Sequence, residues 1–194
     1  MIKFKAVRYK NFLSTGNKVT EIIIDDTRTT LMIGTNGAGK STFLDAISFG
    51  LFGKPFRKVK LGQLVNSINM KNCEVDLEFD VGGKEYVIKR GLKPAKFEIY
   101  VNGSMNDQMA NARDSQDYLE RYVLRMNERS FRQIVVLGSG SFVPFMRLGA
   151  GDRRSIIEEL LDIQIFSVMN DLVKTRISDN KDNLVECEHQ IELL

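Results

Sequence analysis

The run GTNGAGKS at residues 34–41 constrains this chain more than any other feature. It lies between the β-branched and apolar run TTLMIG and the segment STFLDAISFGLFG. In that segment four apolar residues recur at three- and four-residue spacing: Phe43, Ala46, Ile47 and Leu51. The pattern G-x-x-x-x-G-K-[ST] between a strand and a helix is typical of a phosphate-binding loop. We therefore predict a strand, the loop and an amphipathic helix that Gly53 and Pro55 end.

Each part of the loop serves the binding of phosphate. Gly34, Gly37 and Gly39 let the backbone bend and approach the ligand, so that N–H groups at a helix N-terminus point at phosphate oxygens. Lys40 is expected to contact the β- and γ-phosphates, and the Ser41 hydroxyl is expected to ligate Mg²⁺. The catalytic prediction is limited to these two residues, because phosphoryl transfer depends mainly on positioning and charge neutralisation.

Hydrolysis also needs an acidic partner for Mg²⁺ and a residue that positions water. Two segments look like such partners, and we interpret both as structural. The aspartates of IIIDD at residues 22–26 precede the loop by about a hairpin, where a turn is expected. In LGSGS, at residues 137–141, the order of the glycines differs from that of an ATP-binding-cassette signature.

The rest of the chain alternates strands, helices and turns. Period-two patterns predict strands at the N-terminus in IKFKAVRYKNF and KVTEIIID, and then a small antiparallel sheet from residues 73–81, 84–90 and 96–101. Helical spacing follows in residues 115–126 and 151–163, while FRQIVVLGSGSFVPFM predicts a buried strand that enters a Gly/Ser loop.

A heptad pattern occupies the C-terminal thirty residues. Six of the eight heptad positions are apolar. The positions are 170, 173, 177, 180, 184, 187, 191 and 194. This spacing predicts the beginning of a coiled coil whose partner strand lies elsewhere, in a continuation of the chain or in another molecule. A C-terminal helix folded back on the domain is the alternative.

Composition excludes several classes of protein. With 194 residues, 43% hydrophobic and 27% charged, the chain is long and apolar enough for a sizeable core. No apolar run approaches the roughly 20 residues of a membrane span, and no signal peptide is visible, so we expect a soluble, cytoplasmic protein without a membrane partner. Cys73, Cys187 and the single His189 are too few and too scattered for structural zinc.

Charge is distributed unevenly along the chain. Residues 1–60 hold 11 Lys and Arg against 4 Asp and Glu, whereas residues 151–194 hold 5 against 10. KPFRKVK carries four cations directly after the predicted helix: Lys54, Arg57, Lys58 and Lys60. A second group lies in KRGLKPAK. Such cations suit sequence-independent contact with DNA phosphates, and a solubilising surface is the alternative.

Several of these segments together resemble the N-terminal half of SMC/SbcC-type DNA repair ATPases. They are KAVRYKNFLSTG, LMIGTNGAGKSTFLDAISFGLFG and SFRQIVVLGSGSFVPFMRLGAGDRRSIIEELLDI, the last leading into the heptads. The resemblance implies an α/β fold, the N-terminal lobe of a P-loop NTPase of ATP-binding-cassette type with a mixed sheet and an antiparallel subsheet. It places this lobe of the ATPase head in residues 1–165 and the beginning of the coiled coil in residues 166–194.

The resemblance also implies a larger machine. In this family, a C-terminal lobe beyond the coiled coil carries the signature motif and the acidic residues, and two heads enclose two ATP molecules. ATP-driven head dimerisation then controls the access of DNA ends to an SbcD-type nuclease subunit. We therefore expect ATP and Mg²⁺ as cofactors, and we expect the 194 residues alone to lack a complete hydrolytic site.

Carried over residue by residue, the family's nucleotide-binding pattern falls mainly on the loop. The expected contacts are Gly34, Asn36, Gly37, Ala38, Gly39, Lys40, Ser41 and Thr42, with Asn11 as a weaker one. Leu13 stands where family members often have arginine, and Ser139 stands at the position of the Q-loop glutamine. Ser139 is therefore predicted as a second Mg²⁺ ligand, while Gln133 lies too early in the chain to substitute for the glutamine.

Two other functions stay open on the residues alone. A self-contained P-loop kinase or GTPase needs an acidic strand end after residue 60, for which VDLEFD at residues 75–80 is the one weak candidate. A noncatalytic, ATP-dependent DNA-tethering module is the other. The heptads favour the repair ATPase or the tethering module over the kinase.

Overall fold

A computed structural model describes residues 2–25, 29–57, 59–106, 111–136, 145–161 and 163–192. The chain forms two compact units, Met1–Phe142 and Val143–Leu194. The expected division into a lobe and a coiled coil at residues 165 and 166 stays a prediction.

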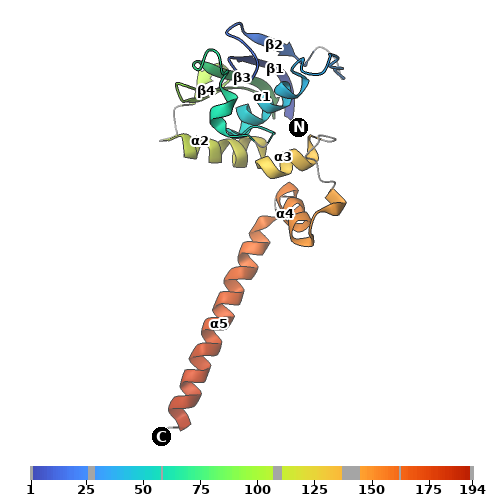
Figure 1. The fold of residues 1–194 in the computed structure, drawn as a ribbon. Helices are drawn as coiled ribbons and strands as arrows, with labels where there is room; N and C mark the ends of the chain where they lie inside the picture. The colour runs from blue at the N-terminus through green and yellow to red at the C-terminus, as the bar shows by residue number, and fades with distance from the viewer. Residues whose placement is uncertain are drawn as a thin grey trace. The chain divides into compact units, whose positions relative to one another are not determined.

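The first unit is built on a six-stranded sheet with the order β2-β1-β3-β4-β5-β6 (Figure 1). The strands are β1 Ile2–Lys10, β2 Thr20–Ile23, β3 Cys73–Val81, β4 Lys84–Leu92, β5 Lys96–Val101 and β6 Ser104–Met105. Every pairing among them is antiparallel, as predicted for the hairpin series, so the expected mixed sheet is represented here by its antiparallel part.

Helices cover one face of this sheet and complete the predicted α/β class. They are α1 Lys40–Phe52, the 3₁₀ turn η1 Leu61–Leu64, α2 Ala112–Tyr118, the π-helical turn η2 Leu119–Leu124 and α3 Glu128–Ile134. The apolar residues of β3 alternate as predicted, with Val75, Leu77 and Phe79 fully buried. Phe52 of α1 packs on Phe131 of α3 with ring centroids 5.3 Å apart.

Helix α1 differs from the prediction in one respect, because it is not amphipathic. Its last eight residues, Asp45–Phe52, are all buried. Buried side chains of the sheet, of η2 and of α3 belong to the same apolar core as this helix. Gly53 ends the helix as predicted, with φ 69° and its N–H donated to the Phe49 carbonyl at 2.8 Å.

A ladder of ion pairs crosses β1 and its neighbouring strands. Lys5 Nζ lies 3.0 Å from Asp80 and 2.9 Å from Glu85, and Lys10 pairs with Glu74 at 3.1 Å. Arg8 bonds Glu21 and Glu78 at 2.6 and 3.1 Å. Carboxylates of neighbouring strands thus pair with three of the eleven Lys and Arg residues that the sequence concentrates in the first sixty positions.

The strand predicted at TTLMIG is wrong. Residues 29–34 take no regular structure, and the side chains of Leu31 and Ile33 are 79% and 84% exposed. A strand is stable when its backbone groups are paired and one of its faces is covered. The second condition is not met for this segment within the described part of the chain, because Leu31 and Ile33 are exposed.

The buried strand predicted from residue 131 is also wrong where the structure describes it. Residues 128–134 form α3, in which Phe131 is buried while Ile134 is exposed. The Asn127 side chain accepts the Ser130 N–H at 3.0 Å and caps the helix. This start signal, followed by the Glu128–Arg132 ion pair at 2.7 Å, outweighs the β-propensity of the residues that follow.

The second unit contains three helical elements: η3 Phe145–Arg147, α4 Ala150–Leu160 and α5 Gln164–Glu192. The helix predicted from Gly151 is confirmed by α4. Helix α5 runs for 29 residues and carries seven of the eight predicted heptad positions, with Val173, Ile177 and Leu184 each at least half exposed, while position 194 lies outside the described residues. None of the described helices is long and apolar enough to cross a membrane.

Candidate phosphate-binding site

The loop at residues 34–41 makes a tight bend into the N-terminus of α1. Gly37 and Gly39 have φ of 87° and 93°, a conformation that glycine adopts without strain. The Ala38 N–H is donated to the Thr35 carbonyl at 3.2 Å, which closes the turn. A Cβ at Gly34 would lie 3.1 Å from that of Ala38, so a larger residue at this position would be tightly packed against Ala38.

Lys40 reaches back across the loop. Its Nζ donates to the carbonyl oxygens of Gly34 and Thr35 at 2.5 and 2.8 Å. The ammonium group therefore lies at the concave side of the backbone bend, beside the first turn of α1. The positive charge of Lys40 and the partial positive charge of the helix N-terminus therefore lie beside the same space, and both favour the binding of an anion there.

The first turn of α1 contains no negatively charged side chain that would bind to its N-terminus. No side chain caps its N-terminus, and no acidic residue lies in the turn. Ser41 is exposed, whereas Thr42 is buried and donates its backbone N–H to the Gly39 carbonyl at 3.0 Å. An exposed hydroxyl next to Lys40 fits the predicted role of Ser41 as a Mg²⁺ ligand.

A cavity of about 400 Å³ opens beside the loop. It is lined by Ala38, Gly39 and Lys40, by residues 30–33, and by Tyr9, Thr20 and Ile22 of the sheet. The sheet residues of this wall carry no local signal in the sequence, because three segments far apart along the chain form it. Apolar wall residues next to a phosphate-binding loop suit the less polar parts of a nucleotide.

Asn11 is placed differently from its predicted role as a nucleotide contact. It is 1% exposed, and its amide group donates to Asn17 Oδ1 and to the Asn72 carbonyl at 3.0 and 3.2 Å. Its Oδ1 accepts from Asn69 at 2.7 Å. These bonds give Asn11 a structural function in joining two loops, and its contact with a nucleotide stays a prediction without structural support.

Two of the four cations in the basic segment after α1 form ion pairs within the protein. Arg57 donates its backbone N–H and its Nε to the buried carboxylate of Asp45 at 2.9 and 2.5 Å. Lys54 pairs with Glu128 at 3.3 Å, while Lys60 has no ion pair among the described residues. Lys58 lies outside the described residues, so the structure gives no account of its predicted DNA contact.

The acidic candidates named from the sequence are also engaged. Asp25 follows β2 in the predicted turn and pairs with Lys3, and Asp80 of VDLEFD pairs with Lys5. Burial raises the pKa of Asp76, and the neighbouring Glu74 raises it further, against the opposing effect of Lys89. Ser139 and the segment LGSGS lie outside the described residues.

Comparisons with known proteins place the chain in a family. It matches the model of the AAA domain over residues 6–194. It is 46% identical over 175 residues to exonuclease subunit 2 of Enterobacteria phage T4, covering 90% of this chain and 31% of that protein. The chain thus spans less than a third of the length of this relative.

Two more distant similarities agree with this result. The chain is 30% identical over 174 residues to the DNA double-strand break repair Rad50 ATPase of Thermoplasma acidophilum, covering 87% of this chain and 19% of that protein. The Smc head domain with an extended coiled coil from Pyrococcus furiosus, bound to the C-terminal domain of ScpA, shares the fold. Its TM-score is 0.66 at 23% identity, over 99% of this chain and 50% of that one.

The predicted resemblance to SMC/SbcC-type DNA repair ATPases is therefore confirmed, and the self-contained kinase or GTPase loses its support. The chain belongs to the AAA domain family and is a relative of phage exonuclease subunit 2 and, more distantly, of the Rad50 ATPases of DNA double-strand break repair.

Proposed function

We propose that this chain is the ATP-binding N-terminal lobe of the ATPase subunit of a DNA-repair and recombination nuclease. The observation that carries the proposal is the bend at residues 34–41, which brings Lys40 and the uncapped N-terminus of α1 to one side of the loop. The relatives named above are an exonuclease subunit and a repair ATPase, which supports the same reading.

The residues of the loop divide the work of binding ATP. Backbone N–H groups from Gly37 to Ser41 donate hydrogen bonds to the phosphate oxygens, and Lys40 leaves the carbonyls of Gly34 and Thr35 to bind the terminal phosphates. Ser41, and Ser139 if its position is that of the Q-loop residue, hold Mg²⁺, which neutralises phosphate charge when bound. The segment 30–33 and Tyr9 form the wall beside the base and ribose.

A binding measurement tests this proposal. We expect the chain to bind Mg²⁺-ATP in isothermal titration, and we expect Lys40→Ala to weaken binding by at least about tenfold, because a cation in contact with phosphate is lost. Lys84→Ala, at an exposed hairpin position, is the matched control. Equal affinity of the Lys40 and Lys84 variants would refute the proposal.

In our proposal, ATP hydrolysis requires residues that lie outside this lobe. Two acidic side chains that the sequence offers as Mg²⁺ partners, Asp25 and Asp80, form ion pairs with lysines of β1. We propose that a C-terminal lobe and a second head supply the acidic and signature residues, and that head closure regulates an SbcD-type nuclease subunit. The complex would act in the cytoplasm, that of the infected host if the chain is phage-encoded.

Contact with DNA is proposed for the basic segment after α1. Lys60 is the best probe there, because replacing Arg57 would also leave the buried Asp45 without its partner. We expect Lys60→Glu to weaken the binding of DNA ends independently of sequence and to flatten its salt dependence. Lys84→Glu is the control, and identical salt slopes for the two variants would remove this segment from the interface.

A further inference from the structure

The loop at residues 34–41 contains one of the two Asn-Gly pairs of the sequence. This pair is Asn36–Gly37, and the other is Asn102–Gly103 in the turn between β5 and β6. Because glycine has no Cβ, the side-chain amide of a preceding asparagine can approach the glycine nitrogen closely. Attack of that nitrogen on the amide carbon forms a cyclic imide and releases ammonia. The chain therefore carries the same reactive pair in two different surroundings.

Three properties are common to the two pairs. Asn36 and Asn102 are both exposed, and Gly37 and Gly103 have φ of 87° and 80°. A Cβ placed on either glycine would meet no neighbouring atom within 4 Å. Solvent access and space beside the glycine therefore do not distinguish the two pairs.

The hydrogen bonds of the two asparagines differ. Asn102 Oδ1 accepts the Glu85 N–H at 2.9 Å, and the Asn102 N–H is donated to the Glu85 carbonyl at 2.8 Å. These bonds hold the Asn102 side chain against the start of β4. Within the described part of the chain, neither the Asn36 amide nor the Gly37 N–H has a hydrogen-bond partner. Asn36 can therefore turn toward the Gly37 nitrogen without breaking a hydrogen bond.

The electrostatic surroundings of Asn36 favour the same attack. Lys40 Nζ contacts the carbonyl oxygens of Gly34 and Thr35, so the ammonium group lies beside the peptide that precedes Asn36. The uncapped N-terminus of α1 follows three residues after Gly37. The attack removes a proton from the Gly37 nitrogen and places negative charge on Asn36 Oδ1. A cation and a helix N-terminus stabilise both charges.

We propose that Asn36–Gly37 is a modification site, at which the nucleotide-free chain converts Asn36 to aspartate and isoaspartate. The deprotonated Gly37 nitrogen forms a bond to Asn36 Cγ, and the bond from Cγ to Nδ2 breaks. The amide group leaves as ammonia, and water supplies the proton that the leaving group needs in exchange for the one lost by Gly37. Water then opens the cyclic imide at either carbonyl group.

This modification changes the place that the proposed function assigns to phosphate. Both products carry a carboxylate at position 36, and isoaspartate also lengthens the backbone within the bend. A negative charge beside Lys40 competes with phosphate for the ammonium group and repels it. In the proposed ATP complex, the Gly37 N–H donates to phosphate, so its nitrogen is not available for the attack. Protection by ATP rests on the proposed function, whereas the modification itself does not.

Peptide mapping by mass spectrometry tests the modification. The 194-residue chain is kept without nucleotide at mildly alkaline pH in water that carries a heavy oxygen isotope, and uptake of the label is followed at each asparagine. We expect Asn36 to be converted at least about fivefold faster than Asn102, because the hydrogen bond from Glu85 must first break at Asn102. Equal rates at the two asparagines would overturn the proposal.

Two lysine variants test whether the loop itself promotes the reaction. We expect Lys40→Ala to slow the conversion of Asn36 by at least about threefold, because the cation beside the developing negative charge is lost. Lys71→Ala, at an exposed position outside the loop, is the matched control and should leave the rate unchanged. An unchanged rate in Lys40→Ala, or equal slowing in both variants, would contradict the role of the loop.

Mg²⁺-ATP tests the protection separately. We expect saturating Mg²⁺-ATP to slow the conversion of Asn36 by at least about tenfold without changing that of Asn102, because only the small unbound fraction reacts. We expect Asn36→Asp to weaken ATP binding by about tenfold, because it places a like charge beside phosphate. Asn36→Gln, whose longer side chain closes the ring poorly, should keep its own ATP affinity through an incubation in which the parent chain loses affinity.

The outcomes separate the modification from the proposed function. Rapid conversion of Asn36 in a chain that titration shows to be saturated with ATP would overturn the protection. Full ATP affinity after complete conversion would overturn the effect on phosphate binding. Absence of ATP binding by the unmodified chain would overturn the proposed function and the protection together, and the rates at Asn36 and Asn102 would still decide the modification.

Discussion

At the scale of single residues, Asp45 shows how much of the charge in this head is structural. It is 1% exposed, and its carboxylate accepts two hydrogen bonds from Arg57. We expect Asp45→Ala to lower the free energy of unfolding by about 2 kcal/mol, because the backbone N–H and Nε of Arg57 lose their charged acceptor. Urea denaturation measures this change. Asp117→Ala, at an exposed site on α2, should stay within about 0.5 kcal/mol of the parent chain. Equal stability of the two variants would contradict the structural role of Asp45.

The two cysteines should differ sharply in reactivity. Burial raises the pKa of the Cys73 thiol from 9.0 to about 12, whereas Cys187 is exposed on α5. At pH 8 we expect iodoacetamide to label one thiol per native chain and two in denaturant, as counted by mass spectrometry. Labelling of Cys73 in the native chain at the rate of Cys187 would show that β3 is not closed around it.

The same thiol predicts a dependence of stability on pH. Because its pKa is higher in the folded than in the unfolded chain, its contribution to stability is fully present below pH 9.0. That contribution decreases as pH rises from 9.0 toward about 12. A Cys73→Ser variant should lack this component of the alkaline loss of stability, measured by urea denaturation across that range.

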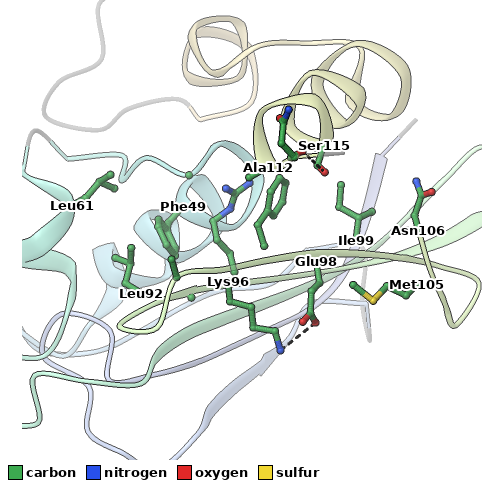
Figure 2. Close-up of a pocket in the computed structure, with 16 residues that line it drawn as sticks. Phe49, Leu61, Leu92, Lys96, Glu98, Ile99, Met105, Asn106, Ala112 and Ser115 are labelled. Carbon is green, nitrogen blue, oxygen red and sulfur yellow. Dashed lines mark hydrogen bonds and ion pairs between the residues drawn. The ribbon is translucent and has the colours of Figure 1, made fainter. Parts of the chain in front are cut away.

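How far a residue's role could be predicted depended on how local its signal is. The position of Lys40 is defined by a motif of eight consecutive residues. The sequence alone therefore predicted that Lys40 lies at the start of a helix. Asn11 and Arg57 were assigned by resemblance and by charge, yet their partners Asn69 and Asp45 lie 58 and 12 residues away. The cavity of about 490 Å³ at the C-terminal end of α1, shown in Figure 2, gave no sequence signal, because its walls come from α1, η1, α2 and three strands.

At the scale of elements, period-two patterns predicted the strands that make hairpins. In β1, β3, β4 and β5, the neighbours in sequence are also partners in the sheet or lie one strand away, so local pattern and tertiary pairing agree. The segment TTLMIG has the same β-propensity but no paired edge among the described residues. Propensity alone did not decide its structure, since a strand depends on its partner.

Helix α5 illustrates the same dependence on a partner. Its heptad residues Ile177 and Leu184 are 50% and 57% exposed. We expect the chain to self-associate at high concentration through this seam, and we expect Ile177→Asp combined with Leu184→Asp to abolish the association in sedimentation experiments. Val185→Asp, which lies off the seam and is 63% exposed, is the control. Unchanged association in the double variant would show that the heptads do not form the contact.

At the scale of the whole molecule, we propose that the chain supplies half of a nucleotide site. Its loop, its basic segment and its exposed heptads each point toward a partner, and the chain spans 31% of the phage relative to which it is similar. The carboxylates considered as Mg²⁺ partners are bound to lysines of β1. Our central claim is that this lobe binds ATP and needs a second lobe to hydrolyse it.

The most direct test compares ATP binding and ATP turnover by the purified 194-residue chain, with Lys40→Ala alongside. Our account predicts binding that Lys40→Ala removes, no turnover by the chain alone, and turnover when the C-terminal lobe is added. Turnover by the 194 residues alone, abolished by Lys40→Ala, would contradict the claim, because it would show that one lobe contains a complete hydrolytic site.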